Sequence, residues 1–194
     1  MPTALNLQHL ICIFVFNIVC ILLVWTNKIR SKLPLSILRN IYFAFVYPHI
    51  LCGIEIYADR SSIHFKKLIT LNNKLLPILQ NKSYKFPVED FDHNFDALAI
   101  PELHIHQLLI LILKFLHHKY LLPTAFANYF TINSAVHLHN TRVRENLHLD
   151  SVSTNYGKRT VRYKASKIWN KLPSISKGIF WSNISVANWR SSGK

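Results

Sequence analysis

The segment from Leu108 to Leu113 reads LLILIL and carries no polar residue on any side. A helix that is apolar all round is buried, so this segment predicts the central helix of the fold. Pro101 can occupy the first turn of that helix, because the N–H that proline lacks would have no intrahelical partner there. The helix is predicted to run to about Lys119.

Apolar residues at helical spacing predict two helices before the central one. The first extends from Leu35 to Ile50 and is expected to end near Pro48, because proline interrupts the hydrogen bonds of a helix. The second begins at Ser61 or Ser62, either of which can cap it. It reaches Leu79, and Pro77 is expected to kink or end it. Its buried side is predicted to consist of Ile63, Leu68, Leu71, Leu75 and Leu79.

Two shorter helices are predicted after the central one, from Thr124 to Phe130 and from about Lys164 to Leu172. The rest of the chain beyond Val136 is expected to form loops and extended pieces. Only four glycines are present, which disfavours a turn-rich β-sandwich. The sequence therefore predicts a mostly α fold: a small helical bundle with a less regular basic C-terminal tail.

Positive charge is concentrated towards the C-terminus. The formal net charge is +14, and seven of the nine acidic residues lie between Glu55 and Glu102. Beyond Val136 only Glu145 and Asp150 oppose a large number of lysines and arginines. Such a distribution favours a polyanionic partner. A solvated basic surface with its aromatic residues turned inward is the structural alternative.

Aromatic residues are interleaved with these cations, as in proteins that bind nucleic acid without sequence preference. Cations neutralise phosphates, and aromatic rings stack on unpaired bases. We therefore expect weak, non-specific binding of RNA or DNA by residues 137–177. The candidate phosphate contacts are Arg142, Lys158, Arg159, Arg162 and Lys164, and the candidate stacking residues are Tyr163 and Trp169. The spacing of Ile168, Trp169 and Asn170 also allows Trp169 to be a core residue.

An almost uninterrupted apolar run extends from Leu10 to Trp25 and is followed by Lys28, Arg30 and Lys32. As a helix it would rise about 24 Å, slightly short of the roughly 30 Å hydrocarbon layer of a membrane. If it inserts, the positive-inside rule places the three cations in the cytosol. A small single-pass membrane protein with a basic cytosolic domain is therefore the alternative to a nucleic-acid-binding protein.

Several short motifs occur in a fixed order along the chain. Near the C-terminus these are His139-Asn140-Thr141-Arg142, Gly157-Lys158-Arg159, Tyr163 and Trp169-Asn170-Lys171-Leu172-Pro173. Tyr47-Pro48 and Gly53-Ile54 precede them, as do Leu122-Pro123 and Phe126. In this order the set resembles the region that follows the palm domain in reverse transcriptases of non-LTR, jockey-like retrotransposons. There an H/Y-N-T-R segment, a basic G-K/R stretch, a tyrosine and W-N-x-L-P follow at similar spacing.

The resemblance runs from about Lys28 to about Ser176 and implies four segments. Residues 1–27 would be a hydrophobic leader, 28–135 a helical thumb-like region, 136–177 a basic C-terminal region and 178–194 an unmatched tail. It also implies RNA and DNA as ligands and an intracellular location, in nucleus or cytoplasm. The palm and its paired aspartates are missing from the match, so the chain is expected to be a truncated remnant that catalyses nothing on its own.

The sequence gives little support to a metal site or a catalytic site. Cys12, Cys20 and Cys52 form no C-x-x-C pair, and the paired histidines lack the i, i+4 spacing of ligands that share a helix face. The acidic stretch Glu89 to Asp96 is predicted to be a solvated linker between helices, not a set of metal ligands. No metal, cofactor or catalytic residue is therefore expected.

Overall fold

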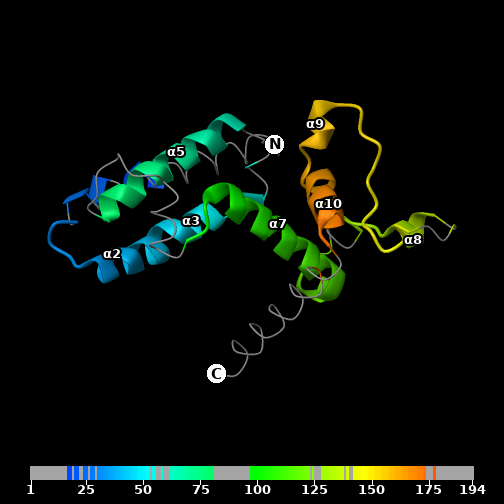
Figure 1. Ribbon diagram of the computed structural model, residues 1–194, viewed down its shortest axis with the longest axis horizontal. Coiled ribbons are helices and arrows are strands. Elements are labelled where there is room, and N and C mark those ends of the chain that lie inside the picture. The colour runs from blue at the N-terminus through cyan, green and yellow to red at the C-terminus, as the bar shows by residue number, and fades with distance from the viewer. Residues whose placement is uncertain are drawn as a thin grey trace, which may run out of the picture. The chain divides into compact units, whose positions relative to one another are not determined.

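The computed structural model describes residues 17–18, 20–21, 24–25, 27–28, 30–52, 54–55, 58, 62–80, 97–122, 124, 128–137, 139, 142–173 and 177. The chain divides into two compact units, an N-terminal unit from Met1 to Gln107 and a C-terminal unit from Leu108 to Lys194. Over the described ranges the structure is mostly helical and contains no strand, which confirms the predicted fold class (Figure 1).

The N-terminal unit contains α2 (Leu35–Ile41), the π-helix η1 (Tyr42–Val46), α3 (Tyr47–Leu51) and α5 (Ser62–Leu79). The helix α7 (Ile100–His117) runs from this unit into the next. The C-terminal unit adds the 3₁₀ turn η2 (Lys119–Leu121), α8 (Asn133–Val136), α9 (Asn155–Lys158) and α10 (Val161–Lys171).

The core of the N-terminal unit contains a stripe of buried side chains spaced every four residues. It consists of Leu38, Tyr42, Val46, Ile50, Ile54 and Ala58. In a regular α-helix each step of four residues rotates the stripe by about 40°. The wider π-helical turn η1 offsets part of this drift, since the N–H of Tyr47 donates to the carbonyl of Tyr42, five residues back. The stripe therefore stays against α5 and the first turn of α7.

The predicted helix from Leu35 to Ile50 corresponds to α2, η1 and α3, which end at Leu51, three residues after Pro48. Pro48 lies in the first turn of α3, directly after η1, where an N–H is not required. Proline would disturb the hydrogen bonds of a regular α-helix at this position, but here the preceding turn is a π-helix. Helical hydrogen bonding then resumes, with Cys52 N–H donating to the Pro48 carbonyl over 3.0 Å.

The helix α5 lies alongside α2 and α3 in the N-terminal unit (Figure 1). Leu68, Leu75 and Leu79 are buried as predicted. Ile63 was predicted to be buried but is 67% exposed, because it shares the outer face of α5 with the exposed Lys67 and Lys74. The helix includes Pro77 and ends two residues later, at Leu79. Ser61, one of the two predicted caps, lies outside the described residues.

One buried polar contact joins the π-helix to α5. The hydroxyl of Tyr42 donates to Oδ1 of Asn72 over 3.0 Å, and each residue is 1% exposed. We expect Tyr42→Phe to lower the free energy of unfolding by about 1–3 kcal/mol, because it leaves the Asn72 oxygen buried without this donor. Urea denaturation of the full chain measures the loss. Adding Asn72→Leu to Tyr42→Phe should recover part of it, and strictly additive losses would contradict this account.

The second half of α7 forms the centre of the C-terminal unit. Leu108, Leu109, Ile112 and Leu113 are buried there, which confirms the central helix predicted from this segment. They pack with Phe115, Phe130, Leu147, Ala165 and Trp169. The boundary between the two compact units falls within α7, between Gln107 and Leu108.

Three other predicted segments lie partly or wholly outside the described residues. The predicted helix from Thr124 to Phe130 is wrong for residues 128–130, which form a turn and a bend; residues 125–127 are outside the described ranges. Most of the apolar run from Leu10 to Trp25 and the whole acidic linker also lie outside them. Among the helices that the structure describes, none is long and apolar enough to cross a membrane.

Candidate nucleic-acid interface

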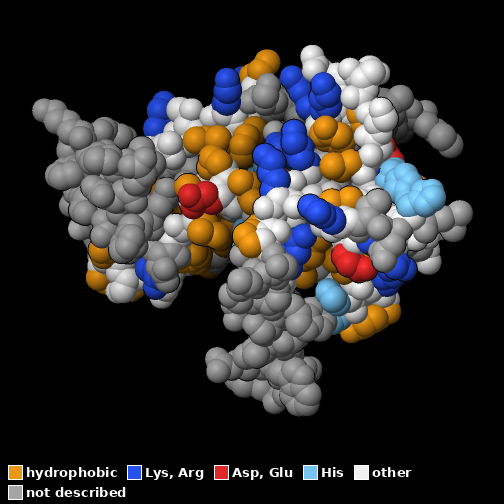
Figure 2. Space-filling model, turned by 45° about the vertical axis from the view of Figure 1, so that its right-hand side comes forward, with side chains coloured by type: hydrophobic (Ala, Val, Ile, Leu, Met, Phe, Trp, Pro, Cys, Tyr) orange, Lys and Arg blue, Asp and Glu red, His pale blue; other side chains and the backbone are white. Residues whose placement is uncertain are grey.

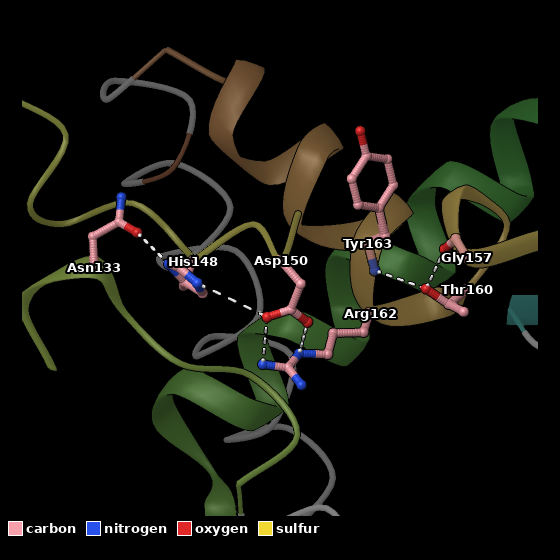
Figure 3. Close-up of polar contacts among 7 residues, drawn as sticks. All are labelled: Asn133, His148, Asp150, Gly157, Thr160, Arg162 and Tyr163. Atoms are coloured by element: carbon pink, nitrogen blue, oxygen red, sulfur yellow. Dashed lines mark hydrogen bonds and ion pairs between the residues drawn. The ribbon is translucent and has the colours of Figure 1, made fainter. Parts of the chain in front are cut away.

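Two threonines fix the corner between α9 and α10. Thr154 caps α9, its Oγ1 accepting from Gly157 N–H over 3.1 Å. Thr160 caps α10: its Oγ1 accepts from Tyr163 N–H over 3.4 Å and donates to the Gly157 carbonyl over 2.7 Å (Figure 3). Because threonine is a strong N-cap, α10 begins at Val161, three residues before the predicted start.

Gly157 permits the close approach of α9 to the extended segment before it. A Cβ atom added at this position would overlap the Cγ1 of Val152. Any other residue would therefore require Val152 or the helix to move. This contact explains why a glycine stands at the head of the Gly157-Lys158-Arg159 motif.

The helix α10 has a buried side and a basic side. Ala165, Ser166 and Trp169 are buried. Lys164, Lys167 and Lys171 follow one another at spacings of three and four residues, which places them on the opposite side. With the exposed Lys158 and Arg159 at the end of α9, they make up what we call the basic surface. Figure 2 shows many more Lys and Arg than Asp and Glu side chains on the face that it presents.

Arg162, a predicted phosphate contact, is engaged with a carboxylate. Its Nη2 donates to Asp150 Oδ1 over 3.3 Å, and its Nε lies 3.2 Å from Oδ2 (Figure 3). His148 Nε2 lies 3.8 Å from the same carboxylate, while its Nδ1 is 3.2 Å from Asn133 Oδ1. Arg162 therefore ties α10 to the segment around residue 150, and we leave it out of the basic surface.

The two predicted stacking residues differ in their surroundings. Trp169 is only 6% exposed and belongs to the core of the C-terminal unit. Lys177 Nζ lies 5.5 Å from its ring centroid. Its burial favours the core role over the stacking role for Trp169. Tyr163 is half-buried, with Lys167 Nζ 5.9 Å from its ring centroid, and its ring points away from the Arg162–Asp150 pair (Figure 3).

Asn170 joins the end of α10 to the segment before α9. Its Oδ1 accepts from the backbone N–H of Leu147 over 3.0 Å, and its Nδ2 donates to the Leu147 carbonyl over 2.8 Å. Leu147 is itself 1% exposed and forms an isolated antiparallel bridge with Ile132. Trp169 and Asn170 in the Trp-Asn-x-Leu-Pro motif therefore hold the C-terminal unit together.

Of the predicted phosphate contacts, Lys158 and Arg159 lie at the end of α9 and Lys164 lies on α10. Arg142 is exposed in the turn of residues 142–145, beyond His139, which is also exposed; Asn140 and Thr141 lie outside the described residues. The candidate set omitted Tyr156, which is 58% exposed on α9. Its place three residues before Arg159 was a signal that could have identified it.

The titratable groups elsewhere in the described parts of the chain were expected to include no metal ligands. No group of three or more His, Cys, Asp or Glu side chains within those parts is placed to hold a metal ion. The pKa of His117 is lowered by desolvation and, secondarily, by the neighbouring His118. The pKa of Tyr47 is raised by burial. Tyr47 belongs to the N-terminal unit and His117 to the C-terminal unit.

No protein-family model, no curated protein and no solved structure matches this chain. The resemblance to reverse transcriptases thus depends on the short motifs and their order alone.

Proposed function

We propose that the C-terminal unit binds nucleic acid through the basic surface, electrostatically and with little sequence preference. The observation that carries the proposal is the arrangement of α10, whose apolar side is buried while three lysines follow one another on the opposite side. Neither α9 nor α10 contains an acidic residue. Asp150, the acid that precedes them, is paired with Arg162.

Such a surface suits a polyphosphate backbone. Each cation that neutralises a phosphate releases a condensed counterion, and the gain in entropy drives binding without reading the sequence. One side of α10 packs against the core, so the lysines are presented on a rigid element and not on a loop. Their long side chains adapt to phosphates at varied spacing, which is consistent with low sequence preference.

For the origin of the chain, we propose that it corresponds to the region after the palm of a non-LTR reverse transcriptase. In support, the residues that carry the resemblance have distinct structural roles here. Gly157 allows a close backbone approach, Trp169 fills the core and Asn170 clamps Leu147. In this proposal the chain contributes nucleic-acid binding to the parent process and performs no polymerisation by itself.

The variant that replaces Lys164, Lys167 and Lys171 with glutamine tests the function. Glutamine preserves helix propensity and removes the charge. We expect the log–log dependence of affinity on salt to become shallower by roughly two units, at about 0.7–0.9 per lost phosphate contact. Fluorescence anisotropy with labelled oligonucleotides, measured across a salt series, gives the slope.

A matched control is available on α5, where Lys66, Lys67 and Lys74 are exposed. Replacing these three with glutamine changes the net charge by the same amount in the other unit. The slope should change much less in this control. An equal loss in both variants would mean that net charge alone drives binding, and the local interface on α10 would be rejected.

A further inference from the structure

Tyr156 is the most exposed aromatic residue next to the basic surface within the described part of the C-terminal unit. Its side chain is 58% exposed, and it stands on α9 two and three residues before Lys158 and Arg159. Residues three apart on a helical turn project to the same side, so Tyr156 and Arg159 share a side of α9. The pattern of an exposed ring beside a cation is typical of surfaces that hold single-stranded nucleic acid.

Several hydrogen bonds and one close packing contact fix the backbone around Tyr156. Its carbonyl accepts from Arg159 N–H over 3.1 Å, and the Thr160 N–H donates to the Gly157 carbonyl over 3.1 Å. Gly157 packs against Val152, and the Thr154 side chain caps the helix. A ring on a fixed turn loses little conformational entropy on binding, and a tyrosine has only two rotatable side-chain bonds to order.

We propose that Tyr156 stacks on an unpaired base while Lys158 and Arg159 neutralise the neighbouring phosphates, so that the C-terminal unit prefers single-stranded to duplex nucleic acid. This inference rests on the proposed function. The bases of a duplex are stacked on their neighbours and paired at their edges, so a protruding ring finds no free face there. In a single strand the face is open, and stacking tolerates any base.

The other aromatic residues of the described C-terminal unit fit this role less well. Trp169 is buried in the core. Tyr163 is half-buried, with Lys167 close to its ring. Tyr120 is 79% exposed, but it lies in η2, far along the chain from Lys158 and Arg159. Tyr156 combines exposure with adjacent cations.

The test compares full-length wild type with Tyr156→Ala, Tyr156→Phe and Tyr120→Ala on two probes. The probes are labelled oligothymidylate and the duplex that it forms with oligoadenylate. Wild type should bind the single strand more tightly. Tyr156→Ala should weaken single-strand binding by about tenfold and leave duplex binding and the salt slope unchanged, because stacking releases no counterions. Tyr156→Phe retains the ring and should bind as wild type does, as should Tyr120→Ala.

The outcomes separate this inference from the proposed function. If Tyr156→Ala binds the single strand as wild type does, while the triple lysine variant loses affinity, stacking is rejected and the electrostatic interface stands. Equal weakening on both probes would also reject stacking on an unpaired base. If wild type binds neither probe at low salt, both proposals fall.

Discussion

Replacing Trp169 with alanine is expected to unfold or strongly loosen the C-terminal unit. The side chain is 6% exposed and packs with α7 and with Phe130 and Leu147 in one core. Truncating a buried tryptophan removes its transfer free energy and leaves a cavity, which together cost about 3–5 kcal/mol. Such a loss is a large part of the 5–15 kcal/mol that stabilise a typical domain. The free energy of unfolding, from urea denaturation followed by circular dichroism, measures the effect.

Trp25 provides the matched control, since it is 65% exposed. Trp25→Ala should change the unfolding free energy by less than about 0.5 kcal/mol, as expected for a surface position. If Trp169→Ala folded normally and lost only its affinity for nucleic acid, Trp169 would be a stacking residue after all, and the core assignment would be wrong.

The sequence predicted those helices whose signals are local. Pro101 and the apolar run from Leu108 to Leu113 placed α7, because one proline and one uniformly apolar segment suffice to locate a buried helix. The start of α10 was predicted three residues late, since Thr160 was not recognised as its N-cap. The π turn η1 could not be predicted, because no local sequence signal distinguishes it from an α-helical turn before Pro48.

The sequence predicted only which types of residue make up the candidate site. The sequence shows that cations gather after Val136, but it does not show which of them already have partners. Arg162 meets Asp150 across twelve residues, and Trp169 meets α7 across more than fifty, so both roles depend on tertiary contacts. Exposure separates Tyr156 from Trp169, and that property comes from packing rather than from the local pattern.

The two hydrogen bonds between Asn170 and the backbone of Leu147 are the basis of the second large expected effect on stability. Replacing Asn170 with leucine removes both hydrogen bonds and leaves the N–H and carbonyl of a buried residue without these partners. We expect a loss of about 2–4 kcal/mol in the free energy of unfolding, from two hydrogen bonds and the desolvated groups that remain. Urea denaturation of the full chain near neutral pH measures this loss.

Asn170→Asp separates the two hydrogen bonds by their chemistry. An ionised aspartate can still accept from the Leu147 N–H, but its second oxygen faces the Leu147 carbonyl and repels it. A protonated aspartic acid donates to that carbonyl and restores the pair. The folded state therefore favours the protonated acid, which raises the pKa of this carboxyl above the ordinary value of about 3.9.

The sign of the pH dependence follows from this raised pKa. The folded variant binds more protons than the unfolded chain between the two pKa values, so its stability falls as the pH rises through that window. Relative to wild type, Asn170→Asp should thus be least destabilised at low pH and most destabilised near neutral pH. Unfolding measured from acid to neutral pH for wild type, Asn170→Asp and Asn170→Leu tests this, because leucine does not titrate. A constant difference between Asn170→Asp and wild type across that range would show that Asn170 does not donate to the Leu147 carbonyl.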